Sequence, residues 1–227
     1  MKNPPVAVLR RIDKMVGIFV EDRDEFVRIG NALVALLAHR RLQPYTHSVR
    51  FRIKDPEHLR DKLLRKYRDA IDKKLPFTIT PDNLYEQVND LVGVRLLHLH
   101  TTQFECINSV LISLLNEELY EIVEGPKAHS WDDEYREYYR SINVEAAGNI
   151  RMYTSVHYVV RPGSRKIMRT AEIQVRTLAE ELWGEVDHSF NYPHASNTVA
   201  VREQIRVLAR MTSSCTRLVD SIFKCSV

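Results

Sequence analysis

The stretch AEIQVRTLAEELWGEVDHS, residues 171–189, decides the fold because its periodicity changes along its length. In the first half, polar and apolar residues alternate strictly, which predicts a β-strand with two different faces. The polar face carries Glu172, Gln174 and Arg176. In the second half, apolar residues recur at helical spacing, which predicts a helix. A surface strand often turns a charged face to solvent, so the question is whether other strands add charges that complete a site.

Two further segments are predicted to join this strand in one sheet and to bring charges to it. SVRFRIK (48–54) alternates, and its polar side carries Arg50, Arg52 and Lys54. DLVGVRLLHLH (90–100) begins at Asp90 and is mostly apolar, as expected of a central strand that is covered on both faces. We interpret His98 and His100 on this strand as structural, because no third metal ligand lies at a useful spacing.

A β-hairpin is predicted next to these strands. RMYTSVHYVVRP (151–162) is the first strand, PGSRK (162–166) is the turn, and RTAEIQVRT (169–177) is the antiparallel partner. The segment from 125 to 149 is polar and rich in tyrosine, and we expect it to be partly helical and to end in a loop.

Helices are expected around these strands. Residues 5–43 are largely helical, and a second helix follows Asp55-Pro56, which suit the N-cap and the first helical position. A helix is predicted near 103–117, followed by a short strand near 119–124, and further helices are predicted at 178–190 and at 197–224. The helix at 178–190 is expected to turn Leu178, Leu182 and Val186 inward. The last helix has a heptad-like seam formed by Val201, Ile205, Leu208, Thr212, Cys215, Val219 and Ile222.

The fold class that follows is α/β (α+β), with a mixed sheet of about five strands flanked by helices. We divide the chain into an N-terminal helical extension (1–47), the sheet-containing domain (48–195) and a C-terminal helix (196–227). The C-terminal helix is expected to pack on the domain, and self-association through its seam to form a homo-oligomer is the alternative.

Composition places the chain among ordinary globular proteins. It has 227 residues, of which 44% are hydrophobic and 28% are charged, and a net charge of +3. That charge is too small to indicate a nucleic-acid binder by itself. The three cysteines form neither a metal motif nor a disulfide framework, so a reducing cytoplasm is expected. No apolar stretch reaches about 18 residues, so no membrane partner is expected.

The charged strand faces suit phosphate chemistry. A pair of carboxylates can hold Mg²⁺, while lysine and arginine neutralise the charge on a polyphosphate. Asp90 and Glu172 are the candidate carboxylates. The sequence contains neither a G-x-x-x-x-G-K-[ST] loop nor a G-x-G-x-x-G motif, so side chains rather than a glycine-rich loop would hold a nucleotide.

Four motifs, in this order, resemble the synthetase domain of the RelA/SpoT family, which makes the alarmones ppGpp and pppGpp. They are RIKDPEHLRDKL (52–63), DLVGVRL (90–96), YTSVHYVV (153–160), and EIQVRT (172–177) followed by AEELWGEVDHSFNY (179–192). The resemblance covers about residues 48–192 and implies a nucleotidyltransferase-like fold. It also implies transfer of the β,γ-pyrophosphate of ATP to the 3′-hydroxyl of GDP or GTP.

The resemblance implies a role for each matching residue. ATP would be held by Arg52, Lys54 and Lys62. Asp90 would bind Mg²⁺, and Glu172 would share the metal region or activate the attacking hydroxyl. The acceptor would be bound by Tyr153, which stacks on its base, and by His157, Gln174, Arg176, Glu185 and Asn191.

Departures from the family pattern gather around the acceptor. Met152 stands where the family usually has glycine, Thr154 replaces glutamine or arginine, and Pro193 stands where lysine is common. The same transfer to a tRNA 3′ end or to an adenosine nucleotide therefore stays open, although tRNA is not the preferred partner. A non-catalytic nucleotide sensor is a third alternative. No H…HD arrangement precedes the synthetase-like region, so we expect a one-way synthetase of the small stand-alone class, or a catalytic piece of a longer protein.

Overall fold

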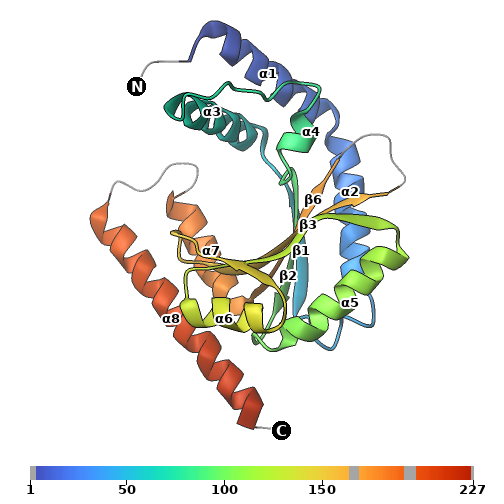
Figure 1. Ribbon diagram of the computed structural model, residues 1–227, viewed down its shortest axis with the longest axis vertical. Coiled ribbons are helices and arrows are strands. Elements are labelled where there is room, and N and C mark those ends of the chain that lie inside the picture. The colour runs from blue at the N-terminus through green and yellow to red at the C-terminus, as the bar shows by residue number, and fades with distance from the viewer. Residues whose placement is uncertain (1–3, 164–168, 192–197, 226–227) are drawn as a thin grey trace.

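The computed structural model describes residues 4–163, 169–191 and 198–225. Its strands are β1 (Ser48–Ile53), β2 (Val92–His98), β3 (Tyr120–Ser130), β4 (Glu145–Ala147), β5 (Thr154–Pro162) and β6 (Ala171–Thr177). Its helices are α1 (Val6–Glu21), α2 (Arg23–Leu37), α3 (Pro56–Asp72), α4 (Leu84–Gln87), α5 (Gln103–Glu117), α6 (Asp133–Ser141), α7 (Leu178–Asn191) and α8 (Val199–Cys225). The strands form one mixed sheet flanked by helices, which confirms the predicted fold class (Figure 1).

The sheet has six strands in the order β1-β2-β6-β5-β3-β4, one more than expected. The pairs β2/β6 and β3/β4 are parallel, and the other neighbouring pairs are antiparallel. The additional strand is β4, which has only three residues and lies in the segment that we expected to be partly helical. Three residues are too few to show a period. The hairpin of β5 and β6 is confirmed, while the predicted turn at 162–166 lies outside the described residues from 164 onward.

Helices α2 and α5 cover one face of the sheet and form the main core with it (Figure 1). Phe26 and Leu33 of α2 and Phe104 of α5 are fully buried there, together with Ile173 of β6. Burying each such side chain contributes roughly 1.5–3 kcal/mol. Because Ile173 points into this core, the alternate residues of β6 must point to the opposite face of the sheet.

Helix α3 begins as the sequence indicates. The carboxylate of Asp55 accepts hydrogen bonds from the backbone N–H groups of Glu57, at 2.8 Å, and His58, at 3.3 Å. Proline follows Asp55 at the first helical position, where no N–H donor is needed. Leu59 and Leu63 are buried, and α3 packs against α1.

Helix α7 differs from the prediction in the face that it buries. Leu182 is 58% exposed, whereas Glu180, Glu181 and Trp183 are buried. The reason is that α7 packs against the polar face of the sheet, where Arg176 needs carboxylate partners. The prediction was therefore wrong for Leu182, whereas Leu178 and Val186 are half-buried and Val186 packs against the cluster that contains Trp183.

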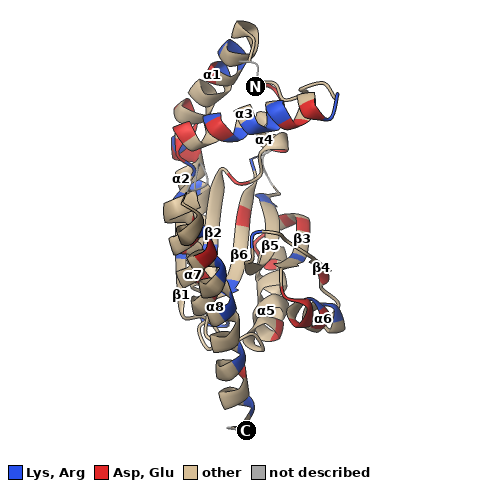
Figure 2. Ribbon diagram, turned by 90° about the vertical axis from the view of Figure 1, so that its left-hand side faces the viewer, with Lys and Arg blue, Asp and Glu red and all other residues tan. Residues whose placement is uncertain are grey.

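Helix α8 also buries a different stripe from the predicted seam. Ile205 and Thr212 are buried as expected, but Cys215 and Ile222 are exposed. The buried stripe continues instead through Ala209 and Thr216. This stripe packs against α7, and the C-terminal end of α8 extends beyond the other elements (Figures 1 and 2). None of the helices in the described ranges is long and apolar enough to cross a membrane.

Candidate active site

The polar faces of four neighbouring strands form the floor of the site. Arg52 of β1 lies opposite Gly93 of β2, and Gly93 lies opposite Glu172 of β6. The next row across the sheet contains Arg95, Gln174 and His157. Both rows project from the face that α2 and α5 leave open. Gly93 adds space to this floor, because a Cβ atom there would meet no other atom within 4 Å.

Asp90 lies between two lysines at one end of this floor. Its carboxylate is 2.9 Å from the Nζ of Lys54, which follows β1, and 2.7 Å from the Nζ of Lys62 on α3. Figure 2 shows α3, with its basic residues, crossing this end of the sheet. Burial alone would raise the pKa of Asp90, but the charges of Lys54 and Lys62 outweigh it and lower the pKa to about 2. Asp90 is therefore fully ionised at neutral pH.

Glu172 is the second carboxylate of the site. It lies 2.9 Å from Nδ1 of His157 and accepts a hydrogen bond from Nε2 of Gln174 at 2.7 Å. Burial acts to raise the pKa of Glu172, but the hydrogen bond and charge of His157 outweigh burial and lower it. The charge of Asp90 raises the same pKa in part, so the two carboxylates interact. Both are ionised, and both face the same space.

Arg95 and Arg176 hold the sheet to α7. Arg176 pairs with Glu181, and Arg95 lies 3.0 Å from Glu181 and also pairs with Glu185. The guanidinium of Arg176 lies against Gly184, where any larger residue would collide with it. These ion pairs turn the buried face of α7 into part of the site wall.

A cavity of about 580 Å³ opens between this floor, α7 and α8. Its predicted residues are Arg52, Tyr153, His157, Gln174, Arg176 and Asn191. Residues that the sequence analysis did not assign to ligand binding also line it, and these are Arg65, Arg95, Ile150, Arg151, Met152, Ser155, Trp183, Gly184, Asp187, His188, Arg202, Ile205 and Arg206. Seven arginines and one carboxylate among the described residues thus face the same space, which favours a polyanionic ligand.

Four predicted residues lie beside the cavity rather than in its lining. Lys54, Lys62, Asp90 and Glu172 adjoin it through Arg52 and His157, which do line it. The structure therefore brings the donor-side and acceptor-side residues onto one face.

Two residues of α7, Glu185 and Asn191, were assigned to the acceptor by resemblance. Only one of the two lines the cavity. Glu185 has a side chain that is 55% exposed, pairs with Arg95 and is not part of the cavity lining. Asn191 lines the cavity and donates from Nδ2 to Asp187 at 2.8 Å. Their roles toward a ligand stay predictions.

The loop that ends in Tyr153 is shaped by one residue of unusual conformation. Met152 has a φ of 61°, in the left-handed region that favours glycine, which gives a physical reason for the glycine of the family pattern at this position. Asn149 donates from Nδ2 to the carbonyl of Tyr153 at 2.6 Å and fixes the end of the loop. The ring of Tyr153 lies nearly parallel to that of His157, with centroids 6.2 Å apart.

His98 and His100 belong to the structure rather than to the site. His98 is buried, its Nδ1 lies 2.9 Å from the carbonyl of His100, and burial lowers its pKa to about 4. His100 stacks on Phe223 of α8. Within the described residues, no three His, Cys, Asp or Glu side chains gather as a ready metal site, so a cation would need ligands from a substrate.

Together, the fold and the site define a mixed-sheet α+β domain that carries two ionised carboxylates and an arginine-lined cavity on one face of its sheet, an arrangement suited to binding phosphates. The sequence model of the family described as "Region found in RelA / SpoT proteins" matches residues 51–197. The chain therefore belongs to the RelA/SpoT family. A comparison with curated proteins finds no match.

Solved structures show the same fold. The chain is similar to a GTP pyrophosphokinase family protein from Streptococcus pneumoniae, with 17% identity, coverage of 91% of both chains and a TM-score of 0.60. It is also similar to small alarmone synthetase 1 from Bacillus subtilis bound to its product pppGpp, with 18% identity, coverage of 92% of this chain and 94% of that chain, and a TM-score of 0.58. The same synthetase bound to AMPCPP matches at 18% identity and a TM-score of 0.54, over 91% of this chain and 95% of that chain.

Proposed function

We propose that this protein is an ATP-dependent pyrophosphokinase that transfers the β,γ-pyrophosphate of ATP to the 3′-hydroxyl of GDP or GTP. The main support is the meeting of three features on one face of the sheet. These are Asp90 between two lysines, Glu172 beside His157, and an arginine-lined cavity that contains Tyr153. Family membership supports the same chemistry, as does the fold shared with a synthetase that was solved with AMPCPP and with pppGpp. We expect such an enzyme to work in the cytoplasm, where its nucleotides are.

On the donor side, we assign the phosphates of ATP to Arg52, Lys54 and Lys62. Lys54 and Lys62 come from different elements and converge on one carboxylate, so both can reach the same ligand. Lysine serves here as a point charge and arginine as a planar fork for phosphate oxygens.

The residues present fit a bound Mg²⁺. Asp90 and Glu172 are both ionised, and Gly93 leaves open space beside Glu172. Mg²⁺ is commonly held by one or two carboxylates together with substrate phosphates, which matches this donor set. The ion would neutralise charge on the transferred pyrophosphate.

On the acceptor side, Tyr153 would stack on the base while Glu172 orients the 3′-hydroxyl. In the transfer, the 3′-oxygen forms a bond to the β-phosphorus of ATP. The bond from that phosphorus to the α,β-bridging oxygen breaks, and AMP leaves with the electron pair. The hydroxyl proton passes to Glu172 or to solvent. Because the pKa of Glu172 is lowered, its main contribution is to accept and orient the hydroxyl rather than to act as a strong base.

The first test replaces Glu172 by Gln, which keeps size and hydrogen-bonding capacity but removes the charge. We expect transfer from γ-³²P-ATP to GDP to fall by about 100-fold or more, while ATP binding, measured by calorimetry, is retained. The matched control is Glu118→Gln on the exposed end of α5, which should leave the rate unchanged. A Glu172→Gln variant as active as the control would remove Glu172 from the catalytic machinery.

The acceptor is tested in the same assay by offering GDP, GTP, ADP, ATP and bulk tRNA separately. Labelled guanosine product supports the proposal. Label only in tRNA or in an adenosine nucleotide would keep the donor assignment and replace the guanine assignment. Absence of label with every acceptor, together with retained nucleotide binding, would favour a sensor.

A further inference from the structure

Helix α8 adds two arginines to the cavity from outside the segment that matches the family. The match ends at residue 197, and α8 begins at Val199. Arg202 and Arg206 of α8 nevertheless line the cavity, together with Ile205 between them. Both arginines are exposed.

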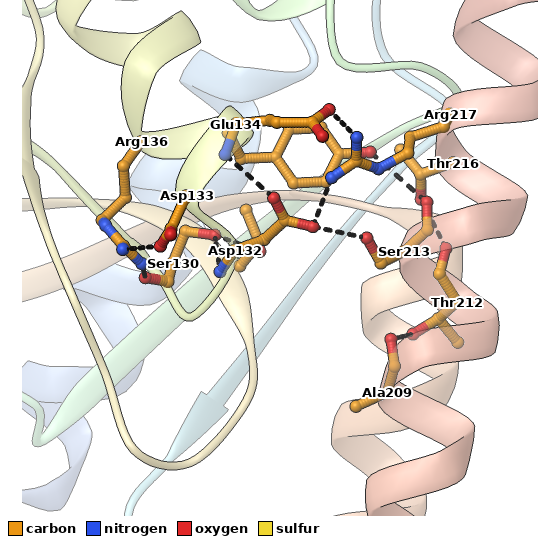
Figure 3. A network of polar contacts seen from close by, with 12 residues as sticks. Ser130, Asp132, Asp133, Glu134, Arg136, Ala209, Thr212, Ser213, Thr216 and Arg217 are labelled. Atoms are coloured by element: carbon orange, nitrogen blue, oxygen red, sulfur yellow. Dashed lines mark hydrogen bonds and ion pairs between the residues drawn. The ribbon is translucent and has the colours of Figure 1, made fainter.

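Helix α8 is fastened to the domain along its length. Near its start, the indole N–H of Trp183 donates to the carbonyl of Ile205 at 3.1 Å. In its middle, the carboxylate of Asp132 accepts from Ser213 at 2.9 Å and from Arg217 at 2.5 Å (Figure 3). Toward its end, the carboxylate of Asp220 accepts a hydrogen bond from the backbone N–H of Thr101 at 2.6 Å. A helix held in this way presents its arginines from a fixed position.

The start of α8 lies beside the predicted acceptor loop. Ile205 belongs to a small apolar cluster with Trp183 and Ala209, and Met152 and Tyr153 pack against that cluster. The two lysines of the donor side do not line the cavity. Arg202 and Arg206 therefore flank the acceptor end of the site.

The two arginines of the sheet are paired more firmly than Arg206 of α8. Arg95 and Arg176 are committed to the glutamates of α7. Arg206 pairs with Glu203 at 2.8 Å, but both side chains are more than half exposed, at 61% and 57%. An exposed pair of this kind is weak, so a phosphate can replace Glu203 as the partner of Arg206.

We propose that Arg202 and Arg206 bind the 5′-phosphates of the acceptor nucleotide and make the enzyme select nucleoside di- and triphosphates over monophosphates. This inference rests on the proposed function. The 3′- and 5′-substituents lie on opposite sides of a ribose. With the base on Tyr153 and the 3′-hydroxyl toward Glu172, the 5′-phosphates point away from the carboxylates and toward α8. Two arginines one helical turn apart match a compact diphosphate better than an extended nucleic-acid backbone.

The test uses the full chain with Arg202→Gln, Arg206→Gln and the double variant. The control is Arg210→Gln, an exposed arginine one turn further along α8. We expect each single change to raise the KM for GDP by about tenfold, with kcat and the KM for ATP unchanged. The preference for GDP over GMP should disappear in the double variant. Equal melting temperatures of all variants would establish that folding is unaffected.

Each result decides the inference separately from the proposed function. A double variant with the same KM for GDP as Arg210→Gln, or with a raised KM for ATP only, would overturn the phosphate role while the transferase stands. Loss of transfer to tRNA alone would assign these arginines to a nucleic acid and overturn it too. If the wild-type protein transfers label to no acceptor, the proposed function fails. The phosphate role of the α8 arginines is then tested by calorimetry of GDP binding. Weaker GDP binding in the double variant than in Arg210→Gln supports the phosphate role, and equal binding refutes it.

Discussion

Glu172 and Glu180 are eight residues apart, yet their surroundings shift their pKa values in opposite directions. Glu172 is matched by His157, and its pKa is lowered. Glu180 is 3% exposed and accepts one hydrogen bond, from the backbone N–H of Thr154 at 2.9 Å. Burial raises the pKa of Glu180 to about 7. Glu180 thus holds the backbone of Thr154, the residue after Tyr153. Its carboxyl group becomes charged only as the pH rises through about 7.

This shift predicts a pH-dependent stability. The pKa of Glu180 is higher in the folded protein, at about 7, than the ordinary value of 4.5. Between these values the folded state keeps a proton that the unfolded state has lost, so this group's contribution to the free energy of unfolding falls as pH rises. Glu180→Gln does not titrate. Its stability relative to wild type should therefore increase by about 3 kcal/mol from pH 4.5 to pH 8.

Urea unfolding of wild type and Glu180→Gln at several pH values measures this difference. Glu118→Gln, on the surface of α5, is the control and should run parallel to wild type. Parallel curves for Glu180→Gln as well would mean that the fold does not raise the pKa of Glu180.

At the scale of single residues, alternation predicted much of the polar floor but not all of it. The outward face of β6 could be predicted because its neighbours Ile173 and Val175 are apolar. Arg95 was missed, because it is one charge in the mostly apolar run of β2, and that run indicated a strand covered on both faces. Only the pairing of β2 with β6, which puts Arg95 opposite Gln174, shows that one face of β2 belongs to the site.

At the scale of elements, most helices and strands could be predicted, because their periods are long enough to read. Helix α5, expected near 103–117, has those bounds, and α3 starts at its predicted cap. The error in the inward face of α7 arose because a helix can bury charge. The inward face of α7 is set by Arg95 and Arg176 of the sheet, and these partners are distant in sequence.

The attachment of α8 can be tested at Asp132. This buried carboxylate caps α6 and also accepts hydrogen bonds from Ser213 and Arg217 of α8. Asp132→Ala leaves these donors without their acceptor, so we expect a loss of about 2–3 kcal/mol in the free energy of unfolding. Faster hydrogen exchange should appear in α8.

The neighbouring Asp133 provides the control, because its side chain is 82% exposed. Asp133→Ala should change stability by less than about 0.5 kcal/mol. If both variants lose the same stability, or if exchange in α8 is unchanged in Asp132→Ala, the link between α6 and α8 is not what holds the helix.

At the scale of the whole molecule, the excess of arginine in the cavity predicts salt-dependent acceptor binding. Screening shortens electrostatic range from about 10 Å at 0.1 M salt to about 3 Å at 1 M. We expect the KM for GDP to rise several-fold between about 0.1 and 0.5 M KCl at saturating ATP. The Arg202→Gln/Arg206→Gln double variant should respond less steeply than Arg210→Gln. Identical slopes would show that the α8 arginines contribute nothing to the attraction.

The triad of Asp90 with Lys54 and Lys62 has a consequence for how the donor arrives. In the free protein these charges satisfy one another. A lone cation would be repelled by the lysines, and lone ATP would draw the lysines away and leave Asp90 buried without a counter-charge. If both entered as one complex, the lysines would pair with phosphate and the carboxylate of Asp90 would hold the metal, so each ligand would remove the obstacle to the other. For the proposed enzyme we therefore expect the binding of nucleotide and of cation to be positively cooperative.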